Sequence, residues 1–530
     1  MTAIGPVPPD TSCGALSNLT GLEPTKIHRF IVGRDQTPAM MDVRELGDPF
    51  AAIVLSSDPP PATAEDVIAR FRAAFTEDDP RALERSFLVG EGSQIPAGDL
   101  DPGARTVRFV VALGTDPVDV ILSAFSPDST SVEVMAWDEQ ATGFNFYRTS
   151  ADGAWVFGGN SRDALEIDTD GKGPFESHTS GSLLMKELRF PWVHWHSDAA
   201  DALVDPAVLQ PAIATHRWAR TVAQSGTLAG AEICETQVAI PSIKRWTDAR
   251  FAAMRSGRLP VRAGRVMRQV LTCPTVNLVT SNTKTRDVTA ATAVDLPAAF
   301  FVDVETLCRA DGLGLAPPPV IAVSGESFLA LVDELDVHLD DGRGFHRDGD
   351  TFFPFLVPER AFEDIAAALA GIDFLYLDRL LAALLLVDLS SPVFSSERST
   401  LLPLIASDDD VPESTAVFSE VMAERVRTRA PEPAKAAFLE VWDAGDAWRD
   451  VANSRLGAYY ARLTARLTDD PTSAFRDWFK VAESRRRHAA IDLHLPIFEF
   501  ALLMSRCNIP ANQRFQLLLD GNVRQTTIDA

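Results

Sequence analysis

The chain has 530 residues, of which 46% are hydrophobic and 23% are charged, so it is long enough for several globular domains with sizeable cores. Its formal net charge of -25 argues against broad binding to nucleic-acid phosphates and against anionic membrane surfaces as partners. Its five cysteines form no C-x-x-C, and its first residues lack a signal-peptide pattern, so we expect a cytoplasmic protein without a disulfide framework.

Residues 1–205 are predicted to form a β-rich α+β region. The stretches "KIHRFIVG" and "FAAIVLSS" are typical of strands. An amphipathic helix is predicted to follow over residues 64–75, with Thr63 as its N-cap. Four extended stretches between residues 106 and 159 then predict a β-meander that ends in a hairpin, with Gly153 in the turn.

The sequence "GFNFYR" alternates within this predicted meander. In a strand, every second side chain points to the same face. We therefore expect Asn145 and Tyr147 to share one face of the strand and Phe144 and Phe146 to share the other.

Residues 206–406 are predicted to form a mixed α/β region. "IPSIKRWTDARFAAMRSG" predicts a helix that ends at Gly257, and "RVMRQVLTCPTVNLVTSN" predicts a strand broken at Pro274. The most apolar run, "LLAALLLVDL", is shorter than the roughly 20 residues that span a bilayer, so it predicts a buried helix.

Residues 407–530 are predicted to be helical, after a linker over residues 407–414. The predicted fold class is therefore α+β, with a β-meander-rich N-terminal region, a mixed α/β middle region and an all-helical C-terminal region. Arg485, Arg486 and Arg487 form the densest basic cluster. We expect them on a solvated helix face that pairs with Asp and Glu, with binding of an anionic ligand as the alternative.

Several sequence motifs of large enzyme classes are absent. The chain contains neither G-x-G-x-x-G after a strand nor G-x-x-x-x-G-K-[ST], so no nucleotide cofactor is indicated. H-E-x-x-H and G-x-S-x-G are also missing.

One short stretch, "FPWVHWHS", suggests a metal site. In a strand, His194 and His196 would project from the same face, where two imidazoles can bind one zinc, iron or copper ion. His178 is the expected third metal ligand. Other candidates for that third position are His216, Glu176, Glu187 and Asp198. The alternative is that both histidines belong to an aromatic-rich core strand.

Two functions follow most directly from these observations, and a small-molecule enzyme without a metal is a third candidate. The first is a metal-dependent enzyme, an oxidoreductase or hydrolase acting on a small molecule, in which Tyr147 and Asn145 contact the substrate. The alternative is a non-catalytic scaffold or homo-oligomeric assembly subunit that binds protein partners. The frequent Ala, Arg, Asp and Pro residues are typical of a bacterial protein.

Overall fold

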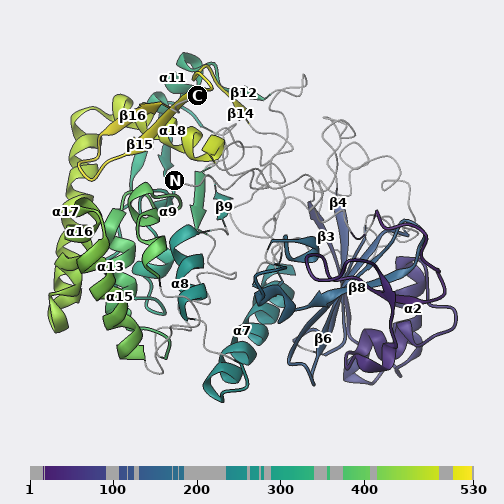
Figure 1. Ribbon diagram of the computed structural model, residues 1–530. Helices are drawn as coiled ribbons and strands as arrows, with labels where there is room; N and C mark the ends of the chain where they lie inside the picture. The colour runs from purple at the N-terminus through teal and green to yellow at the C-terminus, as the bar shows by residue number, and fades with distance from the viewer. Residues whose placement is uncertain are drawn as a thin grey trace. The chain divides into compact units, whose positions relative to one another are not determined.

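The computed structural model, shown in Figure 1, divides into two compact units. Among the described residues, unit 1 extends to Arg250 and unit 2 begins at Phe251. The described residues are 16, 18–90, 107–115, 117–124, 130–169, 171–176, 178, 180–183, 234–259, 263–273, 276–279, 288–339, 355–358, 374–405, 415–488 and 505–527. The boundaries predicted near residues 205 and 406 lie outside this set, so the three-region division stays a prediction.

Unit 1 is built on a mixed sheet, in which the described residues form eight strands in the order β2-β1-β8-β7-β6-β5-β4-β3. Neighbouring strands are antiparallel except for β1 and β8, which are parallel. The strands are β1 (Ile27–Arg29), β2 (Ala39–Met40), β3 (Glu84–Gly90), β4 (Val107–Leu113), β5 (Val120–Ala124), β6 (Val132–Asp138), β7 (Gly143–Thr149) and β8 (Trp155–Asn160). Strands β4 to β8 pair in chain order, which confirms the predicted meander.

The turn between β7 and β8 is the predicted hairpin turn. Gly153 has φ +79°, which a side chain would disfavour, and its N–H donates to the carbonyl oxygen of Ser150 at 2.9 Å. This turn fixes the pairing of β7 with β8. One extra residue on β8, Gly158, interrupts the register opposite Phe146 and Tyr147.

The predicted helix after Thr63 is confirmed as α2 (Ala64–Ala73), and the Thr63 hydroxyl accepts the N–H of Asp66 at 3.2 Å. The strand predicted from "FAAIVLSS" is wrong. Ala51–Leu55 form a short π-helix, η2, because Asp48 accepts the N–H of Ala51 and starts a helical turn there. A short apolar run without alternation fits a buried helix as well as a buried strand.

The remaining short elements of unit 1 lie around the sheet. They are η1 (Val43–Glu45), η3 (Pro80–Ala82), η4 (Asp163–Leu165), η5 (Gly173–Glu176) and η8 (Glu235–Ala239). The helix predicted to end at Gly257 is confirmed as α7 (Ile240–Arg255), and the boundary between the units falls within it.

Unit 2 is mainly helical in its described part. Its helices are α8 (Ala263–Thr272), α9 (Ala298–Phe301), α10 (Val304–Leu307), α11 (Gly325–Glu334), α13 (Asp378–Leu385), η10 (Leu386–Asp388), α14 (Ser396–Ser399), η11 (Leu402–Leu404), α15 (Thr415–Arg429), α16 (Glu432–Trp442), η13 (Gly445–Ala447), α17 (Trp448–Asp469) and α18 (Pro471–Arg487). Small two-stranded sheets pair β10 (Ala293–Asp295) with β11 (Ala322–Ser324), β12 (His338–Leu339) with β14 (Ser505–Arg506), β13 (Phe355–Pro358) with β9 (Val276–Val279), and β15 (Gln513–Leu517) with β16 (Val523–Thr527).

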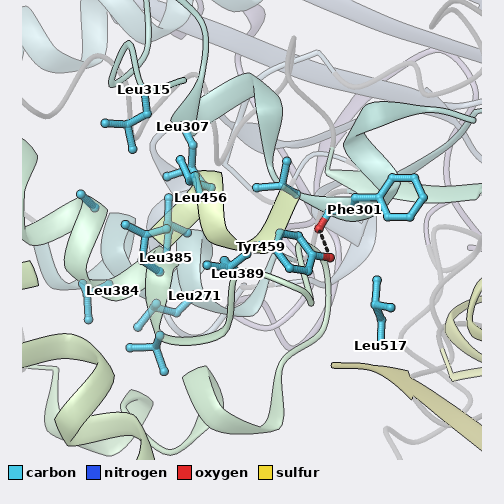
Figure 2. Close-up of a cluster of buried hydrophobic side chains, with 14 of the residues drawn as sticks. Leu271, Phe301, Leu307, Leu315, Leu384, Leu385, Leu389, Leu456, Tyr459 and Leu517 are labelled. Carbon is cyan, nitrogen blue, oxygen red and sulfur yellow. Dashed lines mark hydrogen bonds between the residues drawn. The ribbon is translucent and has the colours of Figure 1, made fainter. Parts of the chain in front are cut away.

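One hydrophobic core holds these helices together. Figure 2 shows leucines of α13 and α17 in this core, with Tyr459, whose hydroxyl donates to the carbonyl oxygen of Phe301 at 3.2 Å. Residues Leu380 to Leu385 are all buried, which confirms the buried helix predicted from "LLAALLLVDL". Within the described residues, no helix is long and apolar enough to cross a membrane.

Two details of unit 2 differ from the prediction. "RVMRQVLT" forms helix α8 instead of a strand, and the helix ends where Cys273 adopts φ +46°. The all-helical prediction for the C-terminal region is correct up to Arg487 but wrong for the hairpin of β15 and β16. The turn of that hairpin contains Asp520 and Gly521, and Gly521 has φ +81°. The α+β class as a whole is confirmed.

Candidate functional site

Of the three histidines predicted as metal ligands, His178 alone lies in the described residues, and it is half-buried in the turn after η5. The alternative ligand Glu176 is the last residue of η5. Its Nδ1 lies 2.8 Å from the carbonyl oxygen of Ser182. A carbonyl oxygen only accepts hydrogen bonds, so Nδ1 carries the proton. In the neutral ring Nε2 then has the lone pair, which is the state in which an imidazole binds a metal through Nε2.

The turn that carries His178 is held in place from several sides. The indole N–H of Trp246 donates to the carbonyl oxygen of Ser180 at 2.7 Å, and the hydroxyl of Ser161 donates to that of Gly181. Gly181 has φ +75°, and a Cβ there would lie 2.4 Å from the backbone oxygen of Ser161. Only glycine fits this close approach, so the turn has a defined geometry.

Aromatic side chains pack beside His178. Its ring centroid lies 5.2 Å from that of Phe146 on β7, and Phe146 meets Phe175 edge to face at 5.4 Å. Gly159 makes room for Phe175, because a Cβ at Gly159 would lie 2.9 Å from that ring. The histidine therefore lies against an apolar surface of the sheet.

Asn145 and Tyr147 point to the opposite face of β7, as the alternation predicted. Both are buried and both bind Asp48, a residue that the sequence analysis did not select. The Tyr147 hydroxyl donates to Asp48 Oδ2, and Asn145 Nδ2 donates to the same oxygen at 2.7 Å. The other oxygen, Oδ1, accepts the N–H of Ala51 at 2.9 Å.

A second buried carboxylate, Asp138, lies on the other side of the Asn145 amide. Asn145 Nδ2 is 3.2 Å from Asp138 Oδ2, which also accepts the N–H of Gly47 at 2.8 Å. Asp138 Oδ1 accepts two backbone N–H groups of the following turn, those of Gln140 and Ala141. We call these residues the Asp48 cluster: Asp48, Asp138, Asn145 and Tyr147.

Burial controls the electrostatics of the Asp48 cluster. It raises the pKa of Asp48, although the hydrogen bonds from Tyr147 and Asn145 oppose the rise. Burial, followed by the charge of Asp48, raises the pKa of Tyr147 well above its ordinary value. Tyr147 is therefore a neutral hydrogen-bond donor whose proton stays directed at Asp48.

The structure does not bring all predicted site residues together. Asn145 and Tyr147 share the Asp48 cluster, whereas His178 contacts Phe146 on the other face of the strand. His194 and His196 lie outside the described residues. The same holds for the alternative third ligands His216, Glu187 and Asp198.

The sequence offered a weak signal for Asp48. It stands three residues before the helical turn that it caps, but the interpretation of "FAAIVLSS" as a strand hid that role. Asp138 ends a strand and accepts the N–H groups of the next turn, which is a common use of Asp.

In the arginine cluster on α18, Arg485 and Arg486 are buried and Arg487 is half-buried, which corrects the prediction of a solvated face. Arg485 donates to the carbonyl oxygens of Phe300 at 2.6 Å and Ser390 at 2.9 Å. Arg486 and Arg487 both pair with Glu483, as the prediction of acidic partners required. These guanidinium groups bind the protein's own carbonyl and carboxylate groups, so they join segments of unit 2.

The described residues alone contain no complete metal site. Within them, no three His, Cys, Asp or Glu side chains lie close enough together to hold a metal ion. A site that uses His178 therefore needs ligands from elsewhere in the chain. The chain matches no protein-family model, no curated protein and no solved structure.

Proposed function

We propose that this protein is a metal-dependent enzyme, an oxidoreductase or hydrolase that acts on a small molecule. His178, His194 and His196 are the proposed ligands of a zinc, iron or copper ion. The observation that carries the proposal is the 2.8 Å contact between His178 Nδ1 and the Ser182 carbonyl oxygen. Metal-binding histidines usually have such a partner, which fixes the ring and leaves Nε2 as the ligand.

The local structure supports this role for His178. The Gly181 turn and its contacts with Ser161 and Trp246 hold the imidazole before any metal binds, which lowers the cost of ordering it. Phe146 and Phe175 give the ring a dry side. A metal with three protein ligands keeps an open position, where it can activate water or dioxygen.

Metal content is the direct test, measured by elemental analysis of protein purified without a metal-affinity tag. His178→Asn keeps a donor for the Ser182 carbonyl but removes the Nε2 ligand, since the Asn side-chain nitrogen takes the place of Nδ1. We expect near-stoichiometric metal in the parent chain and a loss of at least tenfold in metal affinity in this variant. His194→Ala/His196→Ala is expected to lose the metal as well.

His28→Gln is the matched control. His28 is also buried and its Nε2 binds a backbone carbonyl, that of Glu23 at 3.2 Å. Gln keeps a donor at the Nε2 position, so this variant should retain the metal. A parent chain without metal after reconstitution with zinc, copper and ferrous iron would refute the proposal and favour the scaffold or assembly subunit.

A further inference from the structure

The Asp48 cluster places two buried carboxyl groups around one amide. Asp48 is 1% exposed and Asp138 is 4% exposed, and an oxygen of each accepts from Asn145 Nδ2. Two negative charges that contact the same amide nitrogen, and that burial removes from solvent, repel strongly. The pair therefore needs a compensating positive charge.

No cation supplies that charge within the described part of the chain. Every donor to the two carboxyl groups there is neutral: the N–H groups of Gly47, Ala51, Gln140 and Ala141, the Asn145 amide and the Tyr147 hydroxyl. Charged or titratable groups on the neighbouring elements have other partners: Arg44 pairs with Asp42, Arg148 with Glu133 and Arg245 with Glu139, and His28 binds a backbone carbonyl.

A proton fits this site better than a metal ion does. All four carboxyl oxygens already accept a hydrogen bond, so a metal ion would have to displace these donors. Within the described residues, the buried Asn145 Oδ1 has no hydrogen-bond partner, so the side-chain hydrogen bonds of this amide there are its two donations to the carboxyl groups. The raised pKa of Asp48, caused first by burial and also by the charge of Asp138, agrees with proton uptake.

The same two carboxyl groups fix a segment of the chain to the sheet. Asp138 on β6 binds the N–H of Gly47, and Asp48 joins the start of η2 to Asn145 and Tyr147 on β7. Phe50, fully buried, packs on Tyr147 at 5.1 Å between ring centroids. Repulsion between ionised carboxyl groups would act directly on these attachments.

We propose that Asp48, beside Asp138, holds a proton at a pH at which exposed aspartates are ionised, and that loss of this proton loosens residues 47–55 from β6 and β7. The segment is then a pH-sensitive element of unit 1. Its attachment is strongest when the proton is bound at low pH. It weakens as the pH rises through the pKa of Asp48 in the folded protein.

Hydrogen exchange of the full chain, followed by mass spectrometry on peptides that cover residues 47–55, tests this inference. After correction for the intrinsic exchange rate, protection should fall with rising pH, approaching tenfold per pH unit for one linked proton. Asp48→Asn should abolish the pH dependence. Asp42→Asn, which alters an exposed aspartate five residues before this segment, should leave the pH dependence unchanged. Protection that does not vary with pH in the parent chain overturns the inference.

A second measurement does not depend on the folding of Asp48→Asn. Infrared spectra of the chain with isotope-labelled aspartate should contain the carbonyl band of a protonated carboxyl at a pH where exposed aspartates are ionised. Tyr147→Phe should shift this band, because it removes the phenol hydrogen bond to Asp48. If the band is absent, or if Tyr147→Phe leaves it unshifted, Asp48 does not hold this proton and the inference is overturned.

Discussion

Replacing Tyr147 with Phe removes one hydroxyl from the Asp48 cluster and little else. The ring of Tyr147 packs against Phe50 at 5.1 Å and Phe157 at 5.7 Å, contacts that a Phe side chain can keep. The hydroxyl donates to Asp48 Oδ2, whose other donor is Asn145. The change therefore isolates the hydrogen bond between a buried phenol and a buried carboxyl group.

The size of the effect depends on whether Asp48 is ionised. A hydrogen bond to a charged group contributes about 1.5–3 kcal/mol, against about 0.5–1.5 kcal/mol for a neutral pair. We expect Tyr147→Phe to lower the free energy of unfolding of unit 1 by about 2 kcal/mol when Asp48 is ionised. When Asp48 is protonated at lower pH, the loss should fall to about 1 kcal/mol.

Hydrogen exchange of peptides from β6 and β7 measures this loss in unit 1 alone. A loss of about 2 kcal/mol corresponds to a roughly 30-fold drop in protection. Tyr459→Phe is the matched control in unit 2, because its hydroxyl donates at 3.2 Å to a neutral acceptor, the carbonyl oxygen of Phe301 (Figure 2). The Tyr459→Phe variant should lose about 1 kcal/mol of stability at every pH used for Tyr147→Phe, measured on peptides of α17.

Two outcomes would refute this reasoning. One is a Tyr147→Phe variant as stable as the parent chain, which would mean that the hydrogen bond from Tyr147 to Asp48 does not stabilise unit 1. The other is a loss that does not grow as the pH rises, which would mean that the charge on Asp48 does not change over that range.

Three further predictions concern other contacts. Gly181→Ala should destabilise unit 1 by at least about 1 kcal/mol more than Gly153→Ala does, as measured by thermal unfolding. Both glycines have positive φ, but of the two only Gly181 has backbone atoms within 3 Å of the new Cβ. Arg398→Met should cost unit 2 about 3–5 kcal/mol in urea unfolding, because this buried arginine donates to three carbonyl oxygens near the buried Asp388. Glu483→Gln should remove the part of the acid sensitivity of unit 2 that arises from the lowered pKa of this carboxyl, measured by unfolding at decreasing pH.

The fold was predictable where the pattern was long or carried a specific turn or cap. The meander, the Gly153 turn and helix α2 behind Thr63 all have local causes that can be read from a few residues. The wrong secondary-structure predictions concern short apolar runs. Residues 51–55 and the first part of "RVMRQVLTCPTVNLVTSN" are apolar enough for a strand, and the caps and packing that make them helical come from other parts of the structure.

The candidate site was predictable only in part. The alternation in β7 correctly placed Asn145 and Tyr147 on one face. Their partner Asp48 lies about 100 positions earlier in the sequence, and no local pattern connects residues that far apart. The face on which His178 lies depends on the fold after β8, which the sequence does not indicate.

The two units contain buried carboxyl groups with opposite environments. Within the described residues the donors to Asp48 are neutral, so burial prevails and raises its pKa. Burial also acts to raise the pKa of Glu483, but Arg486 and Arg487 outweigh it and the pKa is lowered. By linkage, the raised pKa of Asp48 makes unit 1 lose stability as the pH rises. The lowered pKa of Glu483 makes unit 2 lose stability as the pH falls below the ordinary pKa of a glutamate. Because the two effects have opposite signs, unfolding followed across pH should separate the contributions of the two units. The difference in sign arises from the side chains around each carboxyl group, which are neutral donors at Asp48 and arginines at Glu483.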